Sequence, residues 1–221
     1  MTNKKPVNFE KRPDAETLEN DPGFRKILEL DFSEMIPFVL SNIRRPGMIH
    51  LFYISLNTIS LLFIVFYAVW SVNTGRLNVG GVLLQFFTGM LAGSFLVIPP
   101  HELLHGMAYK ILGARKIRFG MDLKQFIFYV TADRFTISRR ELAFLALTPF
   151  VSINAVILSV TAFWATPHLL FSASLLLFHN IMCIGDFAMI SYAYNQHGEL
   201  YTYDDTARKM TLFFERDRKS L

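Results

Sequence analysis

The sequence predicts an all-α membrane protein with about four transmembrane helices and a small cytosolic β-hairpin between the second and third spans. Hydrophobic residues make up 52% of the 221 residues and charged residues 18%, whereas soluble domains carry about a quarter charged residues. The mean hydropathy is +0.33, and 22 residues are phenylalanine. These values indicate that lipid forms part of the solvent around this chain.

Four stretches of the chain are long and apolar enough to span a membrane. A helix needs about 20 mostly apolar residues to cross a hydrocarbon core roughly 30 Å thick. The stretches that meet this condition are residues 48–70, 82–112, 142–164 and 169–194. Too little polar sequence remains to wrap four such helices as the core of a soluble protein. Pro99 and Pro100 lie in the second stretch and should kink or break it.

Positively charged residues predict the side on which each loop lies, because Lys and Arg concentrate in cytosolic flanks. The link between spans one and two holds only Arg76, and the link between spans three and four holds neither Lys nor Arg. All other basic flanks fall on one side if both termini are cytosolic, so we predict a multi-pass protein of the cell membrane with that topology. These residues are Arg25, Lys26, Arg44 and Arg45 before the first span, Arg115, Lys116, Arg118, Lys124, Arg134, Arg139 and Arg140 after the second, and Arg208, Lys209, Arg216, Arg218 and Lys219 after the fourth.

The spans divide the chain into three parts. Residues 1–45 are expected to form a polar cytosolic segment, residues 46–195 the transmembrane domain and residues 196–221 a cytosolic tail. In the first part, apolar residues recur near helical spacing over residues 24–39. This pattern indicates a short interfacial helix or, equally, a loosely packed juxtamembrane segment.

The link between spans two and three contains two β-rich runs. The sequences KIRF and FIFYVT flank Gly120, Met121 and Asp122. Such runs on either side of turn residues predict a β-hairpin at the cytosolic surface, with its turn at these three residues.

The second span ends in the sequence HELLH at positions 101–105. Residues four apart lie on one helix face, about 40° apart, so the imidazoles of His101 and His105 can share one Zn²⁺. Glu102 is offset by about 100°, where its carboxylate can take a proton from a zinc-bound water. Three ionisable residues in an apolar stretch are costly unless they serve a site. The motif therefore predicts a zinc site with Glu102 as catalytic base.

A third ligand must come from another part of the chain, because a catalytic zinc usually takes three protein ligands and keeps one position open. The fourth span offers His179, Cys183 and Asp186 on one helix face. At 1.5 Å per residue, His101 lies about 28 Å along its span, Asp186 about 25 Å and His179 only about 15 Å. We therefore expect Asp186 to be the third ligand. His179 is the alternative ligand or a polar group lining the cavity, and Cys183 is more typical of a small core residue.

The third span contains one further polar candidate, Asn154. Its side chain could contact the substrate or the transition state. The more common role of an asparagine in a membrane span is a hydrogen bond to a neighbouring helix. Both roles remain open for Asn154.

Together these features resemble the site-2 protease superfamily. The shared features are HELLH in a transmembrane helix, a β-rich insert after it, an asparagine in a following span and the pair Gly185-Asp186 in a later one. Residues 45–195 also resemble a family of bacterial membrane proteins described as zincin peptidases. The expected cofactor is Zn²⁺.

The resemblance implies that His101 and His105 are zinc ligands, Glu102 the catalytic base and Asp186 the third ligand. The chain departs from site-2 proteases in the later span, where residues 184–187 read IGDF in place of Leu-Asp-Gly. It also lacks the Asn-Pro pair of those enzymes. The HELLH motif is therefore the specific part of the resemblance.

We expect a membrane-embedded zinc metalloprotease that cuts a peptide bond in or beside the membrane, near the cytosolic face. The edge of the hairpin would hold the substrate extended. The alternatives are a non-proteolytic zinc-binding membrane scaffold and a zinc hydrolase of a lipid-linked amide or ester. An intact Glu102 favours an enzyme, because a structural zinc needs no neighbouring base. The expected partners are the lipid bilayer and a membrane protein or peptide substrate, without nucleic acid; nothing in the sequence indicates an oligomeric state.

Overall fold

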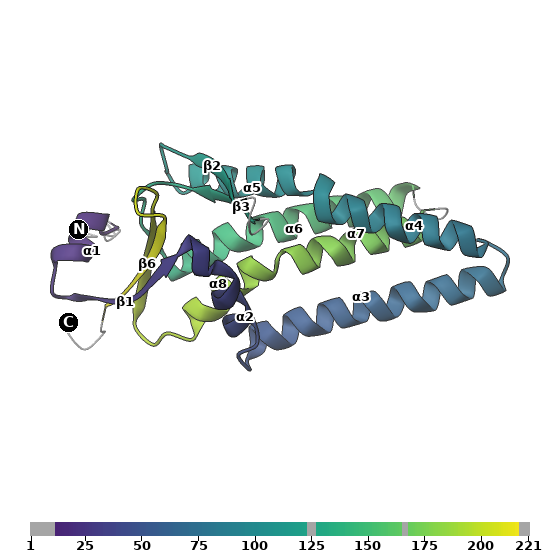
Figure 1. The fold of residues 1–221 in the computed structure, drawn as a ribbon, viewed down its shortest axis with the longest axis horizontal. Coiled ribbons are helices and arrows are strands. Elements are labelled where there is room, and N and C mark those ends of the chain that lie inside the picture. Colours follow the sequence, from purple (N-terminus) through teal and green to yellow (C-terminus); the bar gives the residue numbers. More distant parts are fainter. Residues whose placement is uncertain (1–11, 123–126, 165–167, 217–221) are drawn as a thin grey trace, which may run out of the picture.

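The protein is a bundle of helices with a small β-sheet at one end, as Figure 1 shows for this computed structural model. The structure describes residues 12–122, 127–164 and 168–216. The long helices extend away from the sheet end. The helical elements of the bundle are α2 (Met35–Ile43), α3 (Met48–Asn73), α4 (Val79–Leu91), the π-helical turn η2 (Ala92–Leu96), α5 (Ile98–Ile111), α6 (Arg139–Trp164), α7 (Leu169–Met182) and α8 (Ile184–Tyr194).

Three helical segments of the described chain are long and apolar enough to cross a membrane. They are α3, the run Val79–Ile111 and residues 139–163 of α6, and the bent pair of α7 and α8 adds a fourth if it counts as one span. Only 11% of the apolar window of α3 and 17% of each of the other two is buried inside the protein. So much exposed apolar surface is expected where helices face lipid. The helices are thus compatible with a multi-pass membrane protein.

Two of these segments are interrupted next to the candidate site residues. The helix widens into η2 between α4 and α5, and Pro99 and Pro100 then occupy the first turn of α5, where a missing backbone N–H costs least. The expected irregularity is therefore a π-helical turn just before the prolines, while Val79–Ile111 still runs as one helical segment. Between α7 and α8 the axis bends by 45° at Cys183. The π-helical turn precedes His101, and the bend precedes Asp186.

Two glycines allow α4 and η2 to lie directly against α7. A Cβ atom on Gly89 would come within 2.4 Å of the Phe171 carbonyl oxygen, and one on Gly93 within 2.5 Å of the Leu175 carbonyl oxygen. Both distances are far shorter than van der Waals contact, so only glycine fits. Glycines four apart form the small-residue face by which membrane helices approach closely. This contact sets the position of α7 relative to the helix that carries the HELLH motif.

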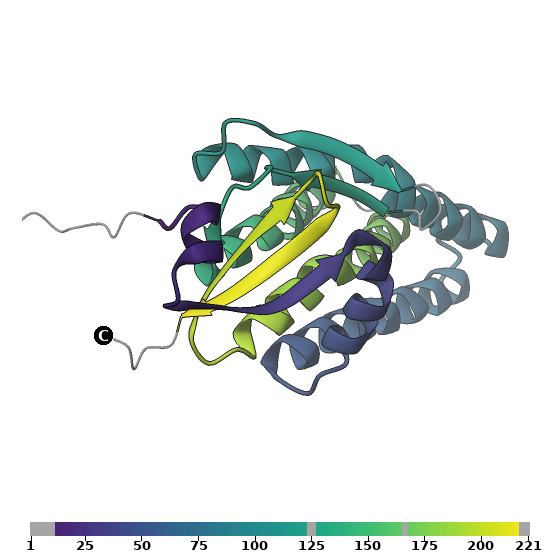
Figure 2. The ribbon, with the colours of Figure 1, turned by 60° about the vertical axis from the view of Figure 1, so that its left-hand side comes forward.

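A four-stranded antiparallel sheet joins segments that are far apart in the sequence. Its strand order is β1-β6-β5-β4, and Phe24 lies opposite Arg216. Figure 2 shows β5 and β6 in yellow beside β1 in purple. The strands are β1 (Phe24–Asp31), β4 (Ile137–Ser138), β5 (Glu199–Asp205) and β6 (Met210–Arg216).

This sheet corrects two sequence predictions. The protein is mostly helical but not all-α, and the interfacial helix expected over residues 24–39 is wrong in its first part, which is β1. The helix α2 begins only at Met35, after a 3₁₀ turn, η1 (Phe32–Glu34). A β-bulge between Lys26 and Leu28 interrupts the alternation of β1, so its apolar residues fall near helical spacing. Its partner β6 lies at the other end of the chain, where local spacing carries no information about it.

Apolar side chains cover both faces of the sheet. Toward the bundle, the ring of Phe213 packs edge-on against Tyr192 of α8, with centroids 4.9 Å apart. On the opposite face, Tyr203 and Leu212 pack under the short helix α1 (Ala15–Asn20). The sheet is therefore part of the same folded body as the bundle.

The hairpin expected between spans two and three is present as β2 (Arg118–Asp122) and β3 (Ile127–Thr131). Its turn is not at residues 120–122, because these belong to β2. Gly120 pairs with Tyr129 and leaves room for its ring, which a Cβ atom would approach to 2.4 Å. The residues that connect the two strands, 123–126, lie outside the described chain.

Candidate metal centre

His101 and His105 lie one turn apart in the first half of α5. Their Nε2 atoms are 3.1 Å apart, and their side chains are only 12% and 13% exposed. The regular helix after Pro100 places both imidazoles on one face. Two ligand-type nitrogens are thus held side by side in an otherwise apolar bundle.

Asp186 joins this pair from the first turn of α8. Its Oδ2 lies 3.3 Å from Nε2 of His101, and its Oδ1 lies 3.2 Å from Nε2 of His105. A helix N-terminus favours a negative charge, because unpaired backbone N–H groups point outward there. Asp186 lies where a third ligand would have to lie.

The three groups have the spacing of ligands around one zinc ion. Ligand atoms bound at 2.0–2.2 Å in a tetrahedral site lie about 3.3 Å from one another. Here the two Nε2 atoms are 3.1 Å apart, and each lies 3.2 or 3.3 Å from one of the two carboxylate oxygens of Asp186. Two imidazoles and one carboxylate are a donor set of catalytic zinc sites. The residues therefore fit Zn²⁺ as they stand.

The second nitrogen of each imidazole also has a partner. Nδ1 of His105 lies 3.0 Å from the carbonyl oxygen of Leu145 on α6, so its N–H donates there and Nε2 keeps its lone pair. Nδ1 of His101 lies 3.4 Å from Nε2 of His179. Both rings are held with Nε2 directed toward Asp186.

His179 forms a second potential metal-binding group with His101 and Cys183, whose Sγ lies 3.6 Å from Nε2 of His179. This group uses Nδ1 of His101, so it lies behind the ring, away from Asp186. The comparison of depths along the two spans predicted that His179 lies far from His101, whereas their ring nitrogens are 3.4 Å apart. That comparison treats both spans as straight, whereas one widens at η2 and the other bends at Cys183.

Asn154 is separated from His101 and His105 by the ring of His179. Its Nδ2 donates to Oδ1 of Asn180 at 2.9 Å and lies 3.4 Å from Nδ1 of His179. His179 lines the central cavity, and Asn154 is not among the described residues that do. The asparagine thus links α6 to α7 and contacts the histidine from behind.

Glu102 has one carboxylate oxygen that lacks a partner. Its Oε2 is buried and accepts no hydrogen bond from the described residues. A buried acceptor left unpaired costs about 1–3 kcal/mol. A water molecule bound to a metal at the neighbouring histidines would satisfy this oxygen.

A cavity of about 510 Å³ opens beside this group and extends to the β-sheet. Its walls are mostly apolar and come from α2, α5, α8 and residues 128–131 of β3. His101, Glu102, His105 and Asp186 line one part of it. The candidate metal centre therefore lies in the wall of a chamber large enough for several side chains of a substrate.

Comparison with known proteins places this geometry in a protein class. Residues 94–201 match the model of the family described as "Putative zincin peptidase". The matched segment contains all of α5, α6, α7 and α8, and with them the three candidate ligands. This description implies a zinc metallopeptidase class, with zinc as the cofactor. No curated protein and no solved structure matches the chain.

Sequence reasoning did not find three groups that the structure brings to the cavity. The carbonyl of Leu145 carries no side-chain signal. Tyr109 is one turn beyond His105 on the same helix face, and this i, i+4 spacing could have identified it. Asp204 follows the last span by about ten residues, and its place beside Tyr109 depends on the pairing of β5 within the sheet.

Proposed function

We propose that this protein is a membrane-embedded zinc metallopeptidase that hydrolyses a peptide bond near the cytosolic ends of its spans. The observation that carries the proposal is the trio of His101, His105 and Asp186 at tetrahedral ligand spacing, beside the unpartnered Oε2 of Glu102. A structural zinc site would not need a free carboxylate beside it. The family match supports the same class of enzyme.

Each residue then has a distinct role. His101 and His105 bind the metal through Nε2, and Asp186 binds through a carboxylate oxygen and offsets part of the metal charge. Zinc, when bound, activates a water molecule and polarises the scissile carbonyl. Oε2 of Glu102 takes a proton from the attacking water and delivers it to the departing amine. The Leu145 carbonyl keeps His105 in the tautomer that this binding requires.

The hairpin offers a way to hold the substrate extended. Within the described chain, β3 pairs only with β2, and its residues 128–131 line the cavity beside the metal centre. An extended peptide can add to such an edge by main-chain hydrogen bonds. A peptide bond held in this way is exposed to attack, whereas one inside a helix is shielded.

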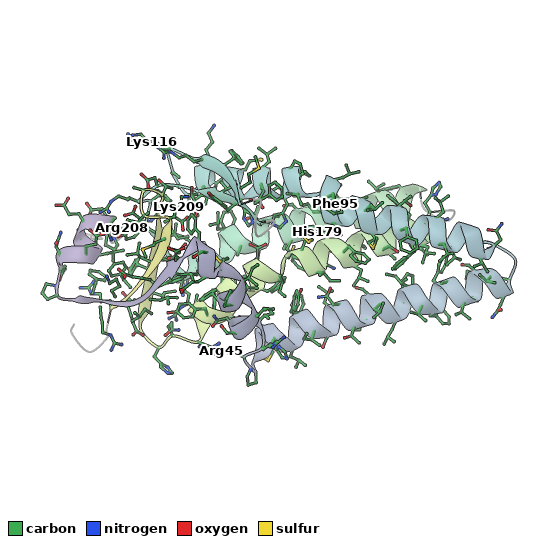
Figure 3. The ribbon with its side chains drawn as sticks, in the orientation of Figure 1. Arg45, Phe95, Lys116, His179, Arg208 and Lys209 are labelled. Carbon is green, nitrogen blue, oxygen red and sulfur yellow. The ribbon has the colours of Figure 1, made fainter. Side chains whose placement is uncertain are left out.

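The membrane orientation of the proposal rests on charge. Figure 3 shows Arg45, Lys116, Arg208 and Lys209 at the sheet end of the molecule, whereas His179 lies within the bundle. Because basic residues concentrate on the cytosolic side, we place the sheet, the hairpin and both termini in the cytosol. The metal centre then lies near the cytosolic boundary of the membrane.

The test uses the purified full-length protein in lipid nanodiscs, loaded with zinc and mixed with a library of transmembrane peptides of known sequence. We expect cleavage in the cytosolic flank or the adjacent part of the span, lost on chelation and lost in Glu102→Gln. The matched control is Glu141→Gln, because Glu141 caps the start of α6 and is not among the described residues that line the cavity. Zinc binding without cleavage of any peptide would favour the scaffold alternative, and release of a lipid-linked amide or ester would favour the other hydrolase.

A further inference from the structure

The central cavity contains a carboxylate that zinc binding and proton transfer do not use. Three acidic residues line it, Glu102, Asp186 and Asp204, and no Lys or Arg is among its described lining residues. The first two belong to the metal centre. Asp204 lies on β5, in the sheet that closes the cytosolic side of the cavity.

The side chain of Asp204 is held in a fixed position on the bundle-facing side of the sheet. Its Oδ1 accepts from the hydroxyl of Thr211 at 2.8 Å, and its Oδ2 accepts from the hydroxyl of Tyr109 at 3.2 Å. Thr211 is its cross-strand neighbour on β6, so both side chains project to the same side. Tyr109 comes from α5, the helix of the metal ligands. The carboxylate is therefore oriented by two separate elements.

Asp204 has no cation partner among the described residues, whereas acidic residues nearby do. Asp205, on the opposite side of β5, lies 3.6 Å from Arg134 and 3.7 Å from Arg208. Glu215 pairs with Arg25 at 3.0 Å. Burial raises the pKa of Asp204 to about 6, against the hydrogen bonds of Thr211 and Tyr109, which lower it. A partly buried carboxylate in an apolar chamber is stabilised by a cation that enters the chamber.

We propose that Asp204 is a specificity subsite that binds a Lys or Arg side chain of the substrate, on the cytosolic side of the scissile bond. The proposal rests on the proposed peptidase function. Tyr109 lies one helical turn, about 6 Å, beyond His105 toward the sheet, and its ring spans the rest of the way to Asp204. At about 3.3 Å per residue of extended peptide, a basic side chain a few residues from the cleaved bond reaches this carboxylate.

The chemistry of membrane substrates matches this subsite. Lys and Arg are enriched just beyond the cytosolic end of a transmembrane segment. A segment whose cytosolic end lies at the metal centre would carry its first basic residues toward the sheet. Recognition of that cation by Asp204 would set the position of the substrate in the site. The scissile bond would then lie at a fixed spacing from the basic flank.

Binding of matched peptides tests the proposal without requiring cleavage. The probes are fluorescent peptides with an oligo-leucine segment and a short flank, in which one of the flank positions two to five carries lysine, acetyl-lysine, norleucine or glutamate. Affinity is measured on full-length Glu102→Gln protein in zinc-loaded nanodiscs. We expect lysine to bind at least about tenfold more tightly than norleucine at one position, a difference of about 1.4 kcal/mol.

Asp204→Asn in the same background should reduce the lysine preference to about twofold or less. Asp205→Asn is the matched control, because it makes the same change on the opposite side of β5, and it should keep the preference. The proposal would be overturned if the Asp204→Asn protein kept an equal lysine preference. It would also be overturned if the protein with Asp204 intact showed no lysine preference. Loss of preference in the control as well would show a general effect of the sheet and would also overturn it.

A second measurement covers the case in which Asp204→Asn does not fold. Carbodiimide joins an amine to a carboxylate only where the two are in contact, forming an amide with loss of water. With the lysine peptide and Asp204 intact, we expect the cross-link at Asp204 by mass spectrometry. A cross-link at another carboxylate, with none at Asp204, would contradict the subsite. If the peptides bind as expected but none is cleaved by the protein with Glu102 intact, the peptidase proposal fails and the cation subsite stands.

Discussion

Nδ1 of His105 lies 3.0 Å from the backbone carbonyl oxygen of Leu145, across the contact between α5 and α6. The N–H of the ring donates to this oxygen, so the other nitrogen is free to bind a metal. No side chain of residue 145 takes part. The orientation of a candidate zinc ligand is thus set by the backbone of a neighbouring span.

Removal of single groups at the metal centre should separate binding from catalysis. We expect about one zinc per chain in the full-length protein, lost in His101→Ala and in His105→Ala because each removes a first ligand. Glu102→Gln should keep its zinc, because the carboxylate serves the water and not the metal. Zinc content by mass spectrometry of the purified proteins measures this. A folded Glu102→Gln protein without zinc would contradict the role assigned to Glu102.

The third ligand can be identified by comparison of two variants. Asp186→Asn should lose zinc and hydrolysis, because an amide neither offsets the metal charge nor binds zinc well. His179→Ala should be milder, with metal affinity reduced about 10–100-fold, because His179 orients His101 through Nδ1. Zinc affinity by competition with a chelator gives both values. The opposite order would make His179 the ligand.

The glycine contact between α4 and α7 should be sensitive to one methyl group. Gly89→Ala places a Cβ atom against the Phe171 carbonyl and should destabilise the bundle by about 1–3 kcal/mol. Gly80→Ala is the control, because its nearest neighbour, Oδ1 of Asn78, would be 3.5 Å away. Thermal unfolding in detergent compares them. A Gly89→Ala protein as stable as the control would mean that α7 can shift away at no cost.

The proposed topology predicts opposite labelling of two engineered cysteines. Cys183 is fully buried and is the only native cysteine. Arg76→Cys and Lys116→Cys would each add one thiol at an exposed position. In intact cells, a membrane-impermeant maleimide should label position 76 and not position 116, because the link between spans one and two lies outside and the link between spans two and three lies inside. Labelling of both, or of neither, would contradict the four-span arrangement.

The pKa of Asp204 predicts a pH dependence of stability. Because its pKa in the folded protein, about 6, is above the ordinary value of 3.8, folding favours the protonated form. This contribution is complete below pH 3.8 and is lost as the pH rises through 6. Asp204→Asn should therefore gain melting temperature relative to the unmodified protein between pH 4.5 and pH 7.5. Zinc-site titrations are common to both proteins and cancel in the difference, and an equal difference at both pH values would refute the assignment.

The parts of this protein that depend on local geometry could be predicted from its sequence. Helix periodicity alone placed His101 and His105 on one face, and hydropathy identified the apolar helices. The pairing of Phe24 with Arg216 could not be predicted, because it joins strands from opposite ends of the chain and a bulge obscures the alternation of β1. The partners of Asp204 and His105 could not be predicted either, because they come from other elements that tertiary packing brings close.

The position of β5 and β6 after the last helix has a consequence for biosynthesis. Because translation runs from the N-terminus, the segment from His101 to Asp186 leaves the ribosome before residues 199–216 do. The metal ligands are thus available while the chamber is still open toward the cytosol. The cytosolic side of the chamber closes only when β5 and β6 pair with each other and β6 pairs with β1. This pairing also places Asp204 against Tyr109. The order of synthesis therefore places the candidate metal ligands ahead of the two strands that complete the chamber.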